Sequence, residues 1–181
     1  MREAHPERRR RFEELFGAYS DDIVAYCRWR AAPGADPRDA VADVFLAAWR
    51  RLDDVPEGDA ARVWLYATAR RVLANQRRSE RRRRALHERL AREPVSLERA
   101  PADDGRVHAA LRTLGDRDRE VLLLAEWEGL SPAQIAAVTG CLAVTARGRL
   151  HRARRRFRAA FEELEPHSGS FHHLRRIDEH V

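Results

Sequence analysis

The stretch from Ser131 to Gly140 constrains the fold more than any other, because it carries both the start and the end of a short helix. Ser131-Pro132-Ala133-Gln134 is a capping box with proline at the first helical position, and Gly140 suits the left-handed conformation of a tight turn. A short capped helix, a glycine turn and a longer amphipathic helix make a helix-turn-helix, which places its second helix in the major groove of DNA. The longer helix is expected here, because apolar residues recur on one face at Ala146, Leu150, Ala153, Phe157 and Phe161.

The expected second helix of this unit is strongly basic. Residues 141–161 hold seven arginines and no acidic residue, and residues 77–84 hold six arginines against one glutamate. Two short basic blocks indicate two contacts with a polyanion, although a helical hairpin with a solvated face has the same charge pattern. Arginines near the start of such a helix reach base edges and later ones meet phosphates. The DNA-binding candidates in this helix are Thr145, Arg147, Arg149, His151, Arg152, Arg154, Arg155 and Arg158.

Two shorter helices are expected ahead of this unit, each with one apolar face. The first covers about residues 107–114, and the second opens at Asp116 and ends at Gly129. Their expected core residues are Val107, Ala110, Leu111, Leu114, Val121, Leu122, Leu124 and Ala125.

The N-terminal half predicts three further helices. The first is broken at Pro33-Gly34, and the second begins at Asp36-Pro37, an N-cap followed by proline. A loop at residues 53–59 separates the second helix from a third, which is expected from about Ala60 to Arg78. The expected buried residues are Phe12, Leu15, Phe16, Tyr19, Ile23 and Tyr26 in the first helix, Val41, Val44, Phe45, Ala48, Trp49 and Leu52 in the second, and Val63, Trp64, Ala67, Val72 and Leu73 in the third.

Between the two halves the composition changes to that of a linker. A charged, helix-compatible run passes into a stretch with two prolines and the sequence Asp103-Asp104-Gly105. We therefore predict an all-α fold of two small helical domains joined by a flexible linker, the second containing the helix-turn-helix. The expected segments are a first domain at 10–79, a linker at 80–105, a second domain at 106–164 and a C-terminal tail at 165–181.

Several functional classes lack their sequence signals. Cys27 and Cys141 are far apart in the sequence, and neither has a second Cys or a His at the spacing of metal ligands. Neither a zinc site nor a disulfide is therefore expected, which is consistent with a protein of the reducing cytoplasm. No apolar run approaches the roughly 18 residues that a membrane span needs. The arginines at 8–11 are not followed by an apolar run, so no signal peptide is expected. The sequence also lacks a phosphate-cradling glycine loop, a metal-ligand cluster and paired carboxylates in an apolar setting. We expect a cytoplasmic protein that is not an enzyme and uses no cofactor or metal.

Short motifs in both halves of the chain match those of one known family. In the C-terminal half they are Arg119-Glu120-Val121-Leu122-Leu123-Leu124, Glu128-Gly129-Leu130-Ser131, Gln134-Ile135-Ala136 and Arg149-Leu150-His151-Arg152-Ala153-Arg154. In the N-terminal half they are Asp43-Val44-Phe45-Leu46, Ala48-Trp49, Trp64-Leu65-Tyr66, Ala69-Arg70 and Arg77-Arg78. These sets resemble conserved regions 4 and 2 of bacterial RNA polymerase sigma factors of the sigma-70 family. The order of the regions, with no third region between them, resembles the extracytoplasmic-function (ECF) group, and the resemblance covers about residues 10–162.

The resemblance implies a promoter-specificity subunit without catalysis of its own. Its expected partners are core RNA polymerase, through the clamp coiled coil and the flap, and promoter DNA, with no membrane insertion. An anti-sigma factor is common in the family, and both domains expose surfaces for one. In the family the second helix binds the clamp coiled coil. The polymerase-binding candidates are the residues that periodicity exposes opposite its buried stripe, Asp39, Asp43, Leu46 and Arg50.

The resemblance also divides promoter recognition between the two domains. The basic helix of the helix-turn-helix would bind the minus-thirty-five element, and the third helix with its preceding loop would read the minus-ten element as the strands open. An unstacked base needs a pocket with backbone contacts, which the loop at 53–59 would supply. Trp64 and Tyr66 are candidates for base stacking, with the core as the favoured place for Trp64. The further DNA-binding candidates are Arg62, Arg70, Arg71, Asn75, Arg77 and Arg78.

Some positions depart from the pattern of the family. Ala42 stands where glutamine is usual, Arg71 where asparagine is frequent, and Leu142 where a serine N-cap is expected, which typically costs about 1 kcal/mol. Gly148 lies inside the basic helix, at a cost of roughly 0.5–1 kcal/mol against alanine.

Two other functions are compatible with a helix-turn-helix. A transcriptional repressor or activator would use the same unit without joining polymerase, and an enzyme of nucleic acid is a third class with little support in the sequence. Neither explains the match of the first domain to a polymerase-binding region.

Overall fold

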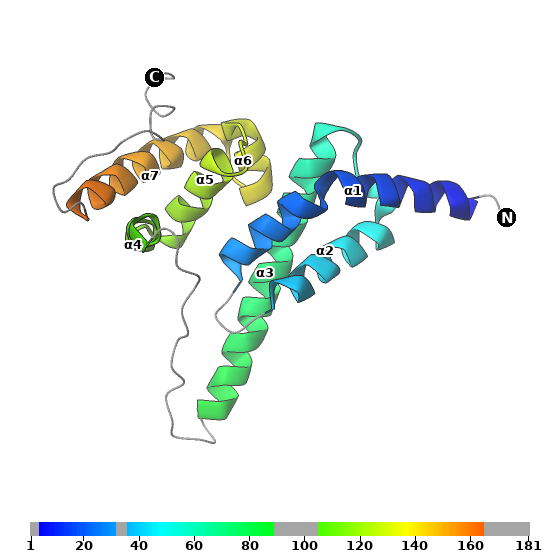
Figure 1. Cartoon of the computed structure of the whole chain (residues 1–181), viewed down its shortest axis with the longest axis horizontal. Coiled ribbons are helices and arrows are strands. Elements are labelled where there is room, and N and C mark those ends of the chain that lie inside the picture. Colours follow the sequence, from blue (N-terminus) through cyan, green and yellow to red (C-terminus); the bar gives the residue numbers. More distant parts are fainter. Residues whose placement is uncertain (1–3, 32–35, 89–104, 165–181) are drawn as a thin grey trace.

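The computed structural model describes residues 4–31, 36–88 and 105–164, which form seven α-helices and one short 3₁₀ helix (Figure 1). The described residues contain no strand, so the predicted all-α fold is confirmed. The elements in chain order are α1 (Ala4–Arg30), α2 (Pro37–Arg50), η1 (Leu52–Asp54), α3 (Asp59–Glu88), α4 (Gly105–Thr113), α5 (Asp116–Glu126), α6 (Pro132–Thr139) and α7 (Ala143–Glu163).

Helices α1, α2 and α3 pack together as the N-terminal domain. Asp36 caps α2 as the sequence predicts, because its carboxylate accepts a 2.8 Å hydrogen bond from the backbone N–H of Arg38. Ile23, Val44 and Leu65 are fully buried, one from each helix. The three-helix domain predicted from the apolar periodicity is therefore present.

The buried face of α2 is confirmed at Val44, Phe45 and Ala48, but two predicted core aromatics lie at its edge. Trp49 is 37% exposed and Phe16 is 45% exposed. Trp49 meets the ring of Phe12 edge-on, with 5.2 Å between the ring centroids. These aromatics pack against one another at the rim because a three-helix domain has too small an interior for all of them.

Helix α3 is longer than the sequence predicted. It continues from Arg78 to Glu88, into the segment that the sequence assigned to the linker. Residues 79–88 contain neither proline nor glycine and are rich in arginine, a good helix former, so nothing in this run stops the helix. The basic block at 77–84 is therefore helical.

The C-terminal domain consists of α4, α5, α6 and α7, at the positions that the sequence predicts. Ser131 and Gln134 form the reciprocal capping box, and Gly140 ends α6 in the left-handed conformation with φ of 69°. Leu142 occupies the N-cap of α7 and makes no side-chain cap hydrogen bond. The helix-turn-helix is formed by α6 and α7, which pack on α5.

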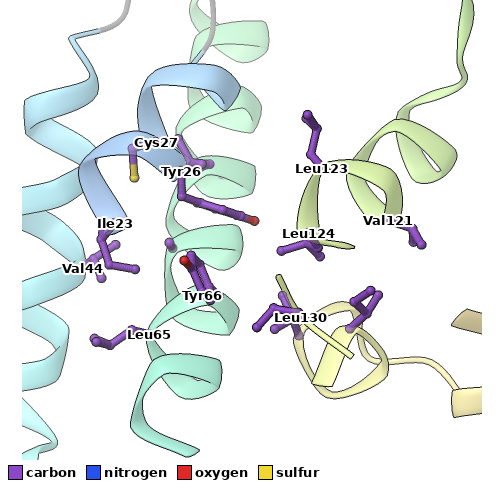
Figure 2. Packing of buried hydrophobic residues seen from close by; sticks show 14 of the residues in the cluster. Ile23, Tyr26, Cys27, Val44, Leu65, Tyr66, Val121, Leu123, Leu124 and Leu130 are labelled. Carbon is purple, nitrogen blue, oxygen red and sulfur yellow. The ribbon is translucent and has the colours of Figure 1, made fainter. Parts of the chain in front are cut away.

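The two domains pack directly against each other, which the sequence did not predict. Helix α3 lies along α6, and the buried hydrophobic residues of both domains form one continuous cluster. Figure 2 shows Tyr26 and Tyr66 of the N-terminal domain facing Leu124 and Leu130 of the C-terminal domain. This contact explains why α3 is buried at Tyr66 as well as at Leu65, because the face of the helix that carries Tyr66 meets the C-terminal domain.

In the part of the chain that the structure describes, no helix combines the length and the apolar character needed to cross a membrane.

Candidate nucleic-acid interface

Helix α7 presents a basic face that is open to solvent. Ala146, Leu150 and Ala153 are buried against the rest of the C-terminal domain, and Phe157 is half-buried on the same side. The apolar stripe predicted for this helix is confirmed, so its arginines lie on the remaining surface.

The arginines of α7 fall into two groups. Arg154 forms an ion pair with Glu126 at 2.8 Å, and Arg156 forms one with Asp118 at 2.7 Å, both within the C-terminal domain. By contrast, the four other candidates at the start and middle of the helix have no hydrogen-bond or ion-pair partner among the described residues: Arg147, Arg149, Arg152 and Arg155. The second group leaves its guanidinium donors available for an external anion. His151 and Arg158 are also exposed on this helix, while Thr145 is half-buried.

Two exposed apolar side chains at the tip of α7 were missed in the sequence. Leu142 is 72% exposed and Val144 is 65% exposed, the highest values among the exposed large hydrophobic residues of the described chain. The signal was present in the sequence, because Val144 does not belong to the Ala146, Leu150 and Ala153 stripe. Residues at the N-terminal end of a recognition helix are those that contact base edges, so these two side chains belong to the candidate interface.

The exposed face of α2 is confirmed. Asp39, Asp43, Leu46 and Arg50 are all exposed, and Leu46 retains 45% of its accessible surface. The carboxylate of Asp43 accepts one long hydrogen bond, 3.3 Å from Nε2 of Gln76. The face therefore combines an exposed leucine with two carboxylates that are one helical turn apart, an apolar centre with a polar rim that is compatible with a protein-binding patch.

The candidate DNA-binding residues of α3 divide by position. Towards the C-terminal end, Arg71, Asn75, Arg77 and Arg78 are exposed. Arg71 donates to the carbonyl of Ala67, and Arg78 is hydrogen-bonded to Asn75.

Nearer the start of α3, the cationic side chains are engaged with other parts of the protein. Arg62 donates to Asp22 at 2.9 Å and to the carbonyl of Glu128 at 2.9 Å. Arg70 forms a 2.8 Å ion pair with Glu120. In the second half of the helix, Arg77 is also engaged, because it donates to the carbonyl of Arg30 at 2.7 Å. The C-terminal domain thus supplies partners to two of these candidates, Arg62 and Arg70.

The two aromatic candidates of α3 lie in different surroundings. Trp64 is half-buried against the core of the N-terminal domain, as favoured from the sequence. Tyr66 is fully buried, and its hydroxyl donates a 2.8 Å hydrogen bond to Glu128. Burial, together with the neighbouring Glu128 carboxylate, raises the pKa of Tyr66, so the hydroxyl keeps its proton and acts as the donor.

The loop before α3 borders an open groove. Tyr19 and Arg11 of α1 hold the loop, donating to the carbonyls of Gly58 at 3.1 Å and Val55 at 2.6 Å. The groove has a volume of about 400 Å³, and its apolar lining includes Leu15, Leu52, Val55, Pro56 and Ala61. The lining also contains charged residues, the glutamates Glu7, Glu14 and Glu57 and the arginines Arg10 and Arg11. An open groove with backbone groups at its edge is what an unstacked base needs.

Comparison with known protein families gives two matches that follow one another along the chain, separated by residues 84–103. The sigma-70 region 2 family model matches residues 15–83, and the sigma-70 region 4 family model matches residues 104–157. Together the two matches cover most of the chain, in the order that the sequence motifs indicated.

Full-length relatives agree with these matches. The sigma-E factor of Streptomyces antibioticus is 35% identical, over 85% of this chain and 84% of its own length. The RNA polymerase sigma factor CnrH of Cupriavidus metallidurans is 31% identical, over 84% of this chain and 87% of its own length. The ECF sigma factor SigL of Mycobacterium tuberculosis is also 31% identical, over 83% of this chain and 88% of its own length.

Solved structures show the same fold. RpoE of Bartonella quintana, in complex with the anti-sigma factor NepR, superposes with a TM-score of 0.70 at 24% identity, over 85% of this chain and 98% of that chain. CnrH in complex with the cytosolic domain of CnrY superposes with a TM-score of 0.61 at 26% identity, over 85% of this chain and 89% of that chain. Both superpositions extend over the two domains described above.

Proposed function

The chain belongs to the ECF group of the sigma-70 family, and we infer from this that it is a promoter-specificity subunit of RNA polymerase. It binds core RNA polymerase and directs promoter-specific transcription initiation. The observation that carries this conclusion is the presence of region 2 and region 4, in order, on one chain. We propose that it has no catalysis of its own and acts in the cytoplasm, where the polymerase and promoter DNA are found.

The first test of this function is complex formation between the full chain and core RNA polymerase that lacks a sigma subunit. We expect the two to elute together on gel filtration as a one-to-one complex. A repressor or activator with the same helix-turn-helix would bind promoter DNA and elute apart from the polymerase.

We propose that α2 provides the polymerase contact through Asp39, Asp43, Leu46 and Arg50. The exposure of all four and the absence of a close partner for Asp43 within the described chain support this assignment. In the same way, the α3 arginines and the groove beside the 53–59 loop are proposed to bind the opened minus-ten strand. We also propose that region 2 ends within α3 and that region 4 begins at α4, which the extents of these helices support.

An anti-sigma factor is proposed as a further partner. CnrH, a sigma factor that is 31% identical to this chain, has been solved with the cytosolic domain of CnrY, and its structure superposes on both domains. We propose that a protein of this kind binds this chain.

We propose that α7 binds the minus-thirty-five duplex with the arginines that have no partner among the described residues, Arg147, Arg149, Arg152 and Arg155. The salt dependence of DNA binding distinguishes these arginines from Arg154 and Arg156, which form ion pairs within the domain. Arg155→Ala is expected to make the negative slope of log K against log salt concentration shallower by about 0.9, the value for one lost phosphate contact. Arg156→Ala should leave the slope unchanged, because Arg156 already pairs with Asp118. Fluorescence anisotropy with a labelled duplex at several salt concentrations measures both. Equal losses in the two variants would contradict the assignment.

We propose that Val144 contacts the methyl group of a thymine in the upstream element, since apolar side chains in the major groove recognise that group. Replacing the contacted thymine with deoxyuridine removes one methyl, which is worth about 0.8 kcal/mol, or about fourfold in affinity. The Val144→Ala variant is expected to bind both duplexes equally, whereas Arg155→Ala should keep the wild-type difference. The contact is refuted if no thymine position responds, or if Val144→Ala responds as the wild type does.

A further inference from the structure

Gly148 lies inside α7, at a position where the backbone does not require a glycine. The residue is helical and its φ is not positive, in contrast to Gly140, which ends α6 with φ of 69°. Any other residue except proline can adopt the helical conformation, and alanine would make the helix more stable, because glycine loses more backbone freedom on folding. The local conformation therefore gives no reason for a glycine at this position.

Packing within the protein does not require a glycine at position 148 either. Apart from the neighbouring backbone of α7 itself, a Cβ placed on Gly148 would meet one atom within 4 Å, Nη1 of Arg152 at 3.5 Å. That distance is an ordinary van der Waals contact, and the atom is the far end of a flexible side chain. The described part of the chain thus offers no packing gain that compensates for the stability that Gly148 costs.

Gly148 lies at the centre of the side of α7 that faces away from the rest of the domain. The helical repeat of 3.6 residues places it opposite the buried Ala146, Leu150 and Ala153. The same repeat places four exposed side chains around it, those of Val144, His151, Arg152 and Arg155. The candidate interface therefore has backbone without a side chain at its middle, bordered by an apolar group, an imidazole and two guanidinium groups.

The place of Gly148 along α7 favours a base edge over a phosphate as the group that approaches it. Residues near the N-terminal end of a recognition helix face the base edges, and other positions meet phosphates. Glycine permits a ligand to approach the helix backbone more closely than any other residue does. Arg147 and Arg152 are exposed beside it with no partner among the described residues, so a deeper position of the helix brings their donors to the bases.

We propose that Gly148 determines specificity in the upstream element, because its missing side chain lets a base edge pack directly on the backbone of α7. The glycine lowers the stability of the free protein and raises its affinity for the correct duplex. This inference rests on the proposed function, since it takes α7 as the helix that binds the minus-thirty-five duplex. It predicts that filling the position with a side chain stabilises the protein and weakens sequence-specific binding.

The test compares two glycine-to-alanine variants of the full chain. Gly148→Ala and Gly17→Ala make the same change inside a helix, and Gly17 is an exposed residue of α1 with no atom within 4 Å of an added Cβ. Both variants should raise the midpoint of thermal unfolding by about 1–4 °C. Fluorescence anisotropy measures affinity for a duplex that carries the upstream element of a promoter selected by the complex of the chain with core polymerase. Gly148→Ala should bind it on the order of tenfold more weakly, because a group added to a close contact displaces its neighbours, whereas Gly17→Ala should bind as the wild type does.

A duplex of unrelated sequence shows whether the contact is made to a base. Binding to that duplex depends on phosphate contacts, so Gly148→Ala should keep the wild-type affinity for it. Equal losses on the two duplexes would overturn the inference, and so would a Gly148→Ala variant that binds the selected duplex as tightly as the wild type or more tightly. Gly148→Leu, which also introduces a good helix former, should lose more affinity for the selected duplex than Gly148→Ala does.

The outcomes also separate this inference from the function on which it rests. If the wild-type holoenzyme transcribes from the selected promoter but Gly148→Ala discriminates between the duplexes as the wild type does, the inference fails alone. A wild-type chain that neither joins core polymerase nor supports transcription refutes the function.

Discussion

Replacing Asp43 with arginine is expected to weaken binding to core RNA polymerase by on the order of 100-fold, because like charges that face each other across an interface cost several kcal/mol. Asp43 lies on the exposed face of α2, one turn after Asp39, and these two carboxylates fit a partner that brings cations. The side chain has no buried role, so the free energy of unfolding should change by less than about 0.5 kcal/mol. Titration of labelled protein with core polymerase measures the affinity, and urea unfolding measures the stability.

A charge reversal elsewhere provides the control for this result. Glu13→Arg makes a matching charge reversal on α1, where Glu13 is exposed and, within the described part of the chain, pairs with Arg9 at 2.8 Å. This variant should bind core polymerase as the wild type does. Equal losses in the two variants would mean that overall charge, and not the α2 face, determines polymerase binding.

Truncation of Leu124 is expected to have the largest effect on stability. This side chain is fully buried where the two domains meet, and removing a buried leucine side chain down to alanine costs about 2–5 kcal/mol. Leu46→Ala makes the identical chemical change on the 45%-exposed α2 face, and should cost less than about 0.5 kcal/mol while weakening polymerase binding.

Urea unfolding of the two leucine variants, combined with polymerase titration, separates stability from function. Comparable losses of stability in Leu124→Ala and Leu46→Ala would contradict the burial that the structure assigns to them. Unchanged polymerase affinity in Leu46→Ala would remove the apolar centre from the proposed contact patch.

The helix-turn-helix was predictable because its boundaries are set by local chemistry. The capping box of Ser131 and Gln134 and the left-handed Gly140 each act within a few residues, so the sequence contains the whole signal. The exposed face of α2 followed in the same way from helical periodicity, which separates Asp39 and Asp43 from the buried stripe.

The extension of α3 beyond Arg78 was mispredicted because a charged run without stop signals was assigned to a linker. Charge alone does not end a helix, and residues 79–88 contain neither a glycine nor a proline to do so. Composition is a weaker guide here than the absence of a terminating residue.

The contact between the domains could not be predicted from local patterns. Arg30 and Glu128 are 98 positions apart and look like ordinary surface charges in the sequence, yet both are buried in the structure. The sequence placed Arg62 and Arg70 on the third helix, but the acidic partners of these two residues depend on how the two domains dock. Long-range pairs of this kind carry no periodicity or motif.

Run-off transcription with core RNA polymerase and the full chain tests the central claim most directly. The template is a promoter selected from randomised DNA by the complex itself. We predict a transcript with a defined start that requires the chain, and that is lost with Asp43→Arg and with the Arg147→Ala/Arg149→Ala double variant. Binding of the chain to duplex DNA without association with core polymerase, and without any transcript from a selected promoter, would contradict the assignment as a sigma factor.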